Sequence, residues 1–212
     1  YPNIEFVDPG DIVPNIHAQY RLGWFYDKDG NFDKNRNPID FKKIPLQKTA
    51  TDILGLDYKE VRPKLPKIGN TKRKLVTIAI HSTAQAKYWN NPTGWQDVVD
   101  YLIGKGYEVR LLSKEEDGYM GNIHPKGITQ QPAGDLNSVI KTIQESEFFI
   151  GISSGLSWLA WGCGTPTILI SGFTDVFAEP FDNVYRVINK EVCNSCWSDY
   201  DFDAGNWNWC PV

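Results

Sequence analysis

The chain has 212 residues, of which 41% are hydrophobic and 23% charged, as in ordinary folded globular proteins rather than disordered or fibrous ones. Its 22 basic and 26 acidic side chains give a formal net charge of -4, which argues against nucleic acid as a partner because phosphate recognition needs a basic surface. No apolar run reaches the roughly 20 residues that span a bilayer, so we expect a cytoplasmic protein without a membrane span. The sequence begins without Met and stops soon after a cysteine, which leads us to expect a fragment of a longer protein.

The first 73 residues are polar and aromatic, and prolines divide them into short pieces. A helix is expected only around Thr49 to Leu54. Structureless stretches longer than about 15 residues are uncommon inside compact domains. We therefore interpret residues 1–73 as the tail of an N-terminal domain followed by an interdomain linker.

Apolar runs of strand length alternate with helical patterns between residues 74 and 190. This alternation is typical of βα units in a parallel sheet covered on both faces. Helices are expected over Trp95 to Leu102 and Leu136 to Ile143, where apolar residues recur at helical spacing. Buried strands are expected at residues 75–80, 107–112, 148–150, 167–170 and 184–188. The predicted fold is therefore α/β, a Rossmann-like doubly wound parallel sheet of five strands.

The turn from Gly151 to Gly155 leaves one of these strands and opens a helix at Leu156. Ligands of open α/β sheets bind beyond the carboxyl ends of the strands, and a helix N-terminus offers free N–H groups and a positive dipole end to an anion. Gly155 lets a phosphate come close, while Ser153 and Ser154 add hydroxyl groups. The alternative is that one of the two serines serves only as the N-cap of the helix.

A second candidate is the loop after the first strand, from His81 to Pro92. It carries the hydroxyls of Ser82 and Thr83 and the ammonium of Lys87, a set that suits a diphosphate. The alternative for Lys87 is an ordinary solvated surface lysine. Neither loop contains the Gly-Lys-Ser/Thr of a P-loop or the spaced glycines of a dinucleotide fold, which argues against ATP hydrolysis and hydride transfer.

Residues 191–212 hold an incomplete cysteine metal-binding motif, formed by Cys193, Cys196 and Cys210. The Cys-x-x-Cys spacing lets two sulfurs of one turn reach a single metal ion, and the chemistry alone favours structural zinc. A disulfide between Cys193 and Cys196 is the alternative, which an intracellular setting disfavours. Cys163 is interpreted as a small core residue.

Longer motifs run through the chain: Lys87-Tyr-Trp-Asn-Asn-Pro-Thr-Gly-Trp95, Phe148-Phe-Ile-Gly-Ile-Ser-Ser-Gly-Leu-Ser-Trp-Leu-Ala160, Gly164-Thr-Pro166, Ile170-Ser-Gly-Phe-Thr174 and Tyr185-Arg-Val-Ile-Asn189. Together they resemble the bacterial autotransporter O-heptosyltransferases, relatives of the lipopolysaccharide heptosyltransferases in glycosyltransferase family 9. The resemblance covers essentially the whole chain, because Tyr20-Arg-Leu-Gly23, Pro45-Leu-Gln47 and Asp52-Ile-Leu-Gly-Leu56 resemble the interdomain stretch of that family.

The resemblance implies a GT-B architecture of two Rossmann-like domains, of which this chain holds the C-terminal, donor-binding half. It implies ADP-heptose as the donor, with its diphosphate held by Lys87 and by the turn at Ser153, Ser154, Gly155 and Leu156. Other members of family 9 carry an acidic residue at the position of Ser153, so no carboxylate contact at that position is implied here.

The implied reaction is an inverting transfer of heptose to serine hydroxyls of an autotransporter protein. The catalytic base is expected in the missing N-terminal domain, so the catalytic residues are unknown here and the fragment should bind the donor without efficient turnover. The resemblance also implies a ferric ion, Fe(III), in place of zinc, with a fourth cysteine beyond Val212. A glycosyltransferase using another nucleotide sugar and a non-catalytic nucleotide-sugar or metal-binding module remain alternatives, and a homo-oligomer is compatible with each.

Overall fold

The computed structural model describes residues 2–132, 134–203, 205, 206, 208 and 209, and the chain forms two compact units, Tyr1–Lys64 and Leu65–Val212. The first unit is built around Phe41, whose side chain is fully buried. The rings of Trp24, Tyr26 and Phe32 pack around it at centroid distances of 6.1, 5.4 and 6.4 Å. A small cluster of aromatic rings therefore forms the core of a segment whose sequence shows little regular pattern.

Regular structure in the first unit consists of the 3-10 helix η1 (Phe41–Lys43) and the helix α1 (Leu46–Leu54). Pro45 precedes α1, and Gly55 ends it in the left-handed conformation at φ 67°. The helix predicted around Thr49 is confirmed, and it begins three residues earlier in the chain than the prediction placed it.

The second unit contains a six-stranded sheet in the order β3-β2-β1-β4-β5-β6, and every neighbouring pair of strands is parallel. The strands are β1 (Arg73–Ala79), β2 (Glu108–Leu112), β3 (Thr129–Gln131), β4 (Ser146–Ile152), β5 (Thr167–Ile170) and β6 (Val184–Val187). This order is that of a doubly wound Rossmann-like fold, so the predicted fold class is confirmed.

The predicted number of five strands is wrong, because β3 forms a sixth. Its residues Thr129–Gln131 are polar, and they pair with the segment from Arg110 to Leu112 at the edge of the sheet. An edge strand without an apolar run gives no periodic pattern in the sequence, since only its backbone pairing defines it.

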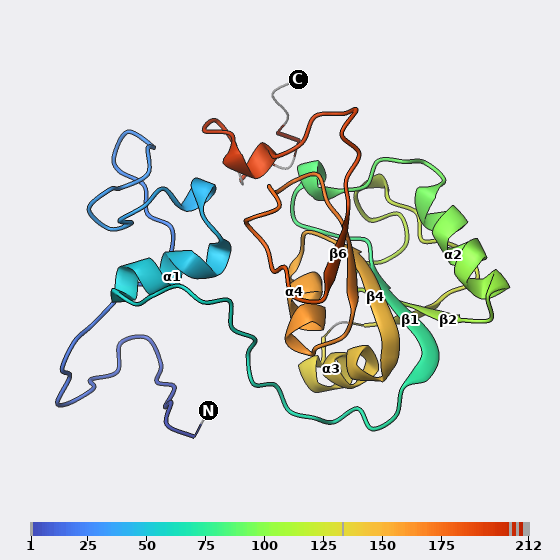
Figure 1. Ribbon diagram of the computed structural model, residues 1–212, viewed down its shortest axis with the longest axis horizontal. Coiled ribbons are helices and arrows are strands. Elements are labelled where there is room, and N and C mark those ends of the chain that lie inside the picture. Colours follow the sequence, from blue (N-terminus) through green and yellow to red (C-terminus); the bar gives the residue numbers. More distant parts are fainter. Residues whose placement is uncertain (1, 133, 204, 207, 210–212) are drawn as a thin grey trace. The chain divides into compact units, whose positions relative to one another are not determined.

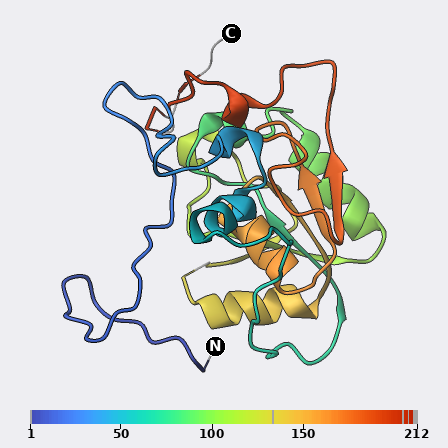
Figure 2. The same cartoon turned by 60° about the vertical axis from the view of Figure 1, so that its left-hand side comes forward.

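Helices cover both faces of the sheet (Figures 1 and 2). On one face, α2 (Gly94–Gly104) packs through Val99 and Leu102 against buried side chains of β1 and β2. On the other, α3 (Leu136–Glu145) and α4 (Gly155–Gly162) enclose a second apolar cluster with Phe149 of β4. Full burial of each such side chain contributes roughly 1.5–3 kcal/mol to folding. These two cores fix the sheet whose carboxyl edge carries the candidate site.

The extended segment that precedes β1 is attached to α3 by one side chain. Gln144 accepts hydrogen bonds from the backbone amides of Ile68 and Gly69 at 3.0 and 2.8 Å, and donates to the carbonyl of Pro66 at 2.8 Å. The two compact units accordingly divide between Lys64 and Leu65, whereas the sequence placed the start of the nucleotide-sugar-binding domain at residue 74.

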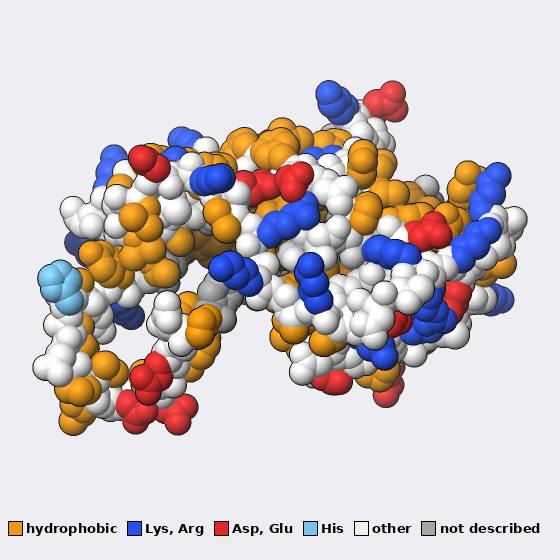
Figure 3. All heavy atoms as spheres, turned by 60° about the horizontal axis from the view of Figure 1, so that its bottom comes forward, with side chains coloured by type: hydrophobic (Ala, Val, Ile, Leu, Met, Phe, Trp, Pro, Cys, Tyr) orange, Lys and Arg blue, Asp and Glu red, His pale blue; other side chains and the backbone are white. Residues whose placement is uncertain are grey.

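None of the helices in the described part of the chain is both long and apolar enough to cross a bilayer. On the face drawn in Figure 3, Lys and Arg side chains are interspersed with Asp, Glu and apolar side chains. That face therefore carries a mixed charge pattern rather than one continuous basic surface.

Candidate functional site

The two predicted phosphate-binding loops follow neighbouring strands in the middle of the sheet. From β1 the chain winds through β2 to β3, and from β4 it winds through β5 to β6 in the opposite direction. Ligands of open α/β sheets bind in the crevice at such a topological switch point, beyond the carboxyl ends of the strands. The fold thus brings the loop after β1, with Ser82, Thr83 and Lys87, next to the turn after β4, with Ser153 and Ser154.

The turn after β4 presents backbone amides. Ser154 is the N-cap residue of α4 by position, but its side chain makes no capping hydrogen bond. Its buried hydroxyl oxygen has no hydrogen-bond partner among the described residues. Gly155 is exposed, a Cβ built there would meet nothing within 4 Å, and Leu156 is half-buried. The open N-terminus of α4 can therefore receive an anion.

Ser153 has a different environment, because it is buried beneath this turn. Its hydroxyl donates to Oε2 of Glu179 at 3.3 Å, and Thr174 donates to the same oxygen at 2.6 Å. Arg186 pairs with this carboxylate at 3.1 Å. Sequence reasoning missed Glu179, since nothing in the local pattern links it to a serine 26 positions earlier in the chain.

The loop after β1 is held by Tyr88. Its phenolic oxygen accepts from the amide of Ser82 at 2.9 Å and donates to the carbonyl of the same residue at 3.0 Å. Thr83 lies exposed at the start of the loop. The 3-10 helix η2 (Gln85–Lys87) then ends on Lys87. Tyr88 thereby closes the loop upon itself.

Lys87 is partly buried rather than fully solvated. Its Nζ lies 4.9 Å from the ring centroid of Phe173, and no described carboxylate lies within ion-pair distance of it. Burial lowers the pKa of Lys87, while the negative charge of Glu179 acts in the opposite direction. An ammonium in this position is well suited to bind an anionic ligand.

His81 begins the same loop, and its Nδ1 lies 2.9 Å from the hydroxyl of Ser113 after β2. Its ring packs against that of His124 at a centroid distance of 5.2 Å. Burial lowers the pKa of His81 to about 4, with a further contribution from His124 that Asp117 opposes. The imidazole is therefore neutral at neutral pH.

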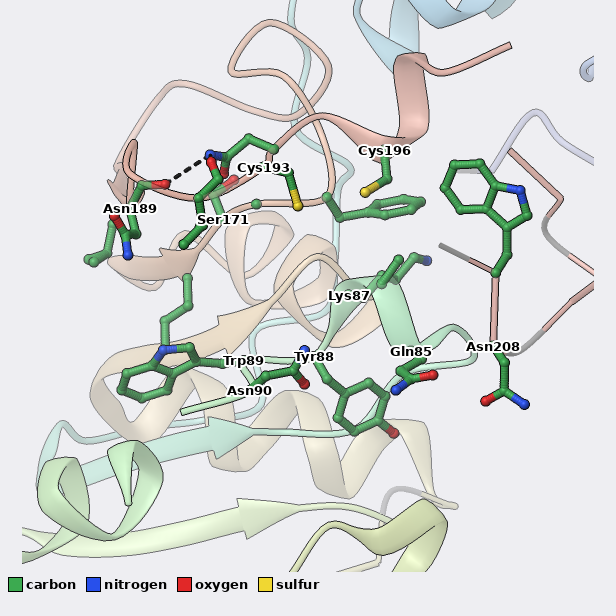
Figure 4. Close-up of a pocket in the computed structure, with 18 residues that line it drawn as sticks. Gln85, Lys87, Tyr88, Trp89, Asn90, Ser171, Asn189, Cys193, Cys196 and Asn208 are labelled. Atoms are coloured by element: carbon green, nitrogen blue, oxygen red, sulfur yellow. Dashed lines mark hydrogen bonds between the residues drawn. The ribbon is translucent and has the colours of Figure 1, made fainter. Parts of the chain in front are cut away.

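A cavity of about 550 Å³ adjoins Lys87 (Figure 4). Its lining is mainly apolar and includes the aromatic rings of Trp89 and Phe173, and the amide side chains of Asn90, Asn189 and Asn194 add polar groups. Amides and aromatic faces suit a neutral polyhydroxylated group or a nucleobase, and Lys87 supplies a positive charge at the margin. The cavity therefore matches part of a nucleotide sugar in its chemistry.

Cys193 and Cys196 line the same cavity, and Figure 4 shows their sulfur atoms pointing into it. Ser195, with φ 69°, turns the chain between them, and its amide donates to the carbonyl of Gly172 at 2.7 Å. Asp175 accepts hydrogen bonds from the hydroxyls of Ser195 and Ser198, the latter in the 3-10 helix η4 (Cys196–Ser198). The cysteine loop is thus attached to the loop that follows β5.

The thiols of Cys163 and Cys193 are free, so no disulfide joins Cys193 to Cys196. Burial raises the pKa of the Cys163 thiol to about 11, as expected for a core cysteine. Cys210 lies outside the described residues, and within them no group of three or more His, Cys, Asp or Glu side chains is arranged to hold a metal ion. The described residues therefore include two of the three cysteines of the predicted metal-binding motif.

Similarity to known proteins extends over the whole chain. Autotransporter heptosyltransferase Aah of Escherichia coli is 38% identical over 221 residues, which cover 100% of this chain and 55% of that protein. The inactive autotransporter heptosyltransferase BimC of Burkholderia thailandensis is 31% identical over 224 residues, which cover 100% of this chain and 51% of that protein. The chain thus spans about half the length of the curated relatives it matches.

A crystal structure of the dodecameric iron-containing heptosyltransferase TibC from Escherichia coli, in complex with ADP-D-β-D-heptose, aligns with a TM-score of 0.84 at 36% identity. The alignment covers 100% of this chain and 56% of TibC, and it confirms the expected fold as part of a GT-B glycosyltransferase. The sequence profile of glycosyltransferase family 9 (heptosyltransferase) matches residues 38–201, which is most of the chain. The chain therefore belongs to glycosyltransferase family 9, the heptosyltransferases.

Proposed function

We propose that this chain is the donor-binding part of a heptosyltransferase, in which the loops after β1 and β4 hold the diphosphate of ADP-heptose. The observation that carries this proposal is the position of Lys87 and of the open α4 N-terminus at adjacent strand ends, on the switch point of the sheet. The amides of Gly155 and Leu156 make no hydrogen bond within the described residues, so they are available to phosphate oxygens.

In the proposed reaction an acceptor hydroxyl attacks the anomeric carbon of heptose from the face opposite the diphosphate. The bond from that carbon to the diphosphate oxygen breaks, which inverts the configuration and leaves negative charge on ADP. Lys87 and the α4 amides stabilise this charge, and their donors are fixed before the reaction begins. A base must take the hydroxyl proton, and we assign none among the residues of this chain.

The remaining parts of the function are inferred from the relatives. Because these are autotransporter heptosyltransferases, we infer a serine hydroxyl of an autotransporter protein as the acceptor. The dodecameric state of TibC supports a homo-oligomer. We also infer a cytoplasmic location, which the free thiols of Cys163 and Cys193 support.

BimC, the relative described as inactive, favours a second candidate function. The same donor fold can serve as a non-catalytic nucleotide-sugar-binding module. Transfer assays with the full-length protein distinguish the two, because a binding module retains ADP-heptose affinity without transferring heptose.

We further propose that Cys193 and Cys196 bind iron together with Cys210. The two described cysteines fit this role, since they flank one turn at Ser195 and line one cavity. A bound ion would act structurally, by cross-linking the ends of this segment. Elemental analysis of the purified protein should give stoichiometric iron that Cys196→Ser removes, along with a lower melting temperature. Stoichiometric zinc without iron would support the structural zinc alternative instead.

The donor assignment can be tested by titration calorimetry with ADP-heptose, ADP, UDP and GDP. We expect ADP and ADP-heptose to bind more tightly than UDP and GDP. Preferential binding of UDP or GDP would indicate a glycosyltransferase that uses another nucleotide sugar. The absence of binding by all four ligands would contradict the proposed site.

A further inference from the structure

Glu179 is a buried carboxylate that the proposed donor site does not use. It lies between β5 and β6, and only 4% of its surface is exposed. Arg186 of β6 pairs with it at 3.1 Å, with 10% of its own side chain exposed. Charges are retained in such an environment only when they are paired and hydrogen-bonded, because their desolvation is costly.

The hydrogen bonds of Glu179 converge on one oxygen, Oε2. It accepts from Ser153 at the end of β4, from Thr174 in the loop after β5, and from Arg186 in β6. Arg186 also donates to the hydroxyl of Ser171 at 3.2 Å. One carboxylate thus connects the carboxyl ends of three adjacent strands at the edge where the donor is proposed to bind.

Ser153 is the link between this network and the donor site. It immediately precedes Ser154 and Gly155, where α4 opens, and its hydroxyl hydrogen is directed to Glu179 beneath the turn. Holding this side chain fixes the backbone that aims the first amides of α4. Burial lowers the pKa of Lys87, and the negative charge of Glu179 opposes this lowering, so the carboxylate also influences the second half of the site.

We propose that Glu179 is a positioning residue for the donor diphosphate, which acts by holding the Ser153 hydroxyl and thereby the amides that open α4. The inference rests on the proposed donor site, and it goes further by assigning a residue that touches no ligand. Amides fixed before binding lose little freedom when the diphosphate arrives, so loss of the carboxylate weakens phosphate binding specifically.

The test compares ADP with adenosine, which lacks the phosphates, by calorimetry. Glu179→Gln should weaken ADP binding about tenfold, the effect of one charged hydrogen bond, and leave adenosine binding unchanged. Glu147→Gln is the matched control, since this exposed residue lies at the amino end of β4 and accepts a hydrogen bond from Tyr107. A variant that is merely less stable would lower the melting temperature without separating the two ligands.

A double-mutant cycle shows whether Glu179 acts through Ser153. If it does, adding Glu179→Gln to Ser153→Ala should reduce ADP affinity by less than about twofold, because the shared interaction is already lost. An undiminished tenfold loss in the double variant would overturn the proposed route. Equal ADP affinity of Glu179→Gln and the wild type would overturn the role itself.

If the chain does not bind ADP, the proposed function is wrong, but the positioning role of Glu179 can still be tested. Amide hydrogen exchange provides this test because it needs no ligand. In the ligand-free protein, Glu179→Gln should accelerate exchange of the amides of residues 153–157, and Glu147→Gln should not. Thr174→Val provides a second variant that keeps the charge while removing one hydrogen bond, and it should accelerate the same amides less. Unchanged exchange in both Glu179→Gln and Thr174→Val would show that Glu179 does not position the turn.

Discussion

The two loops of the proposed donor site are held in different ways. The turn after β4 rests on the buried pair of Glu179 and Arg186, which binds Ser153 from beneath. The loop after β1 is closed by Tyr88, and its Lys87 lies over the ring of Phe173 without a described ion pair. The turn after β4 thus offers backbone dipoles on a buried support, whereas the loop after β1 offers an ammonium that forms no ion pair with a described carboxylate. Anion binding needs both, because dipoles orient the ligand and the charge attracts it.

The largest effect is expected from removing the charge. Lys87→Ala should weaken ADP binding about 100-fold, because a partly desolvated ammonium interacts strongly with a diphosphate. Its unfolding free energy should change little, since no described ion pair is lost. Calorimetry and urea unfolding measure the two quantities. Lys141→Ala is the control, as it removes an exposed lysine on α3. Equal ADP affinity of Lys87→Ala and the wild type would show that the β1 loop does not take part.

Two glycines test the turn after β4. A Cβ at Gly155 would meet nothing within 4 Å, so Gly155→Ala should fold normally yet bind ADP about tenfold more weakly, because a methyl group would then occupy the approach of the phosphate. A Cβ at Gly151 would lie 2.6 Å from the Phe149 ring and 2.9 Å from the Ser157 hydroxyl. Gly151→Ala should therefore destabilise the fold by roughly 1–3 kcal/mol.

These two glycine variants are measured by urea unfolding and by ADP titration. If Gly155→Ala binds ADP as tightly as the wild type, the phosphate does not approach the N-terminus of α4. Of the two loops, only the loop after β1, with Lys87, would then contribute to diphosphate binding.

The smallest expected effect is on the pH dependence of stability. It arises from His81, which belongs to the loop after β1. In the folded protein its pKa is about 4, below the value of 6.5 for an unperturbed histidine. Between these values the unfolded chain binds a proton that the folded chain does not, so stability is full above pH 6.5 and falls as the pH drops toward 4. With allowance for the half-exposed ring, the loss should be roughly 1 kcal/mol.

Urea unfolding of the wild type and of His81→Gln, at about pH 7 and about pH 4.5, measures the stability that His81 costs the fold on acidification. The wild type should lose more stability on acidification than the variant does. An equal loss in both proteins would indicate that His81 is protonated in the fold, against the effect expected from its burial.

Much of the fold could be predicted from periodicity. The apolar runs of β1, β2 and β4 and the helical spacing of Val99 and Leu102 mark elements buried on a covered sheet. The edge strand β3 could not be predicted in this way, since Thr129 and its neighbours are polar and gain their structure from pairing with β2. For the site, the sequence indicated Lys87 and the serine turn because charge and Ser/Gly turns are local features.

The sequence by itself determined the α/β fold class, the two loops at strand ends and the family resemblance. Only the tertiary structure decided that Ser153 is buried on Glu179, that Lys87 lies over Phe173, and that Cys193 lines the cavity beside it. The physical reason is that secondary structure follows from the periodicity of neighbouring residues, whereas buried polar contacts join segments distant in sequence. Such contacts are specified by the packing of strand ends, which no local pattern encodes.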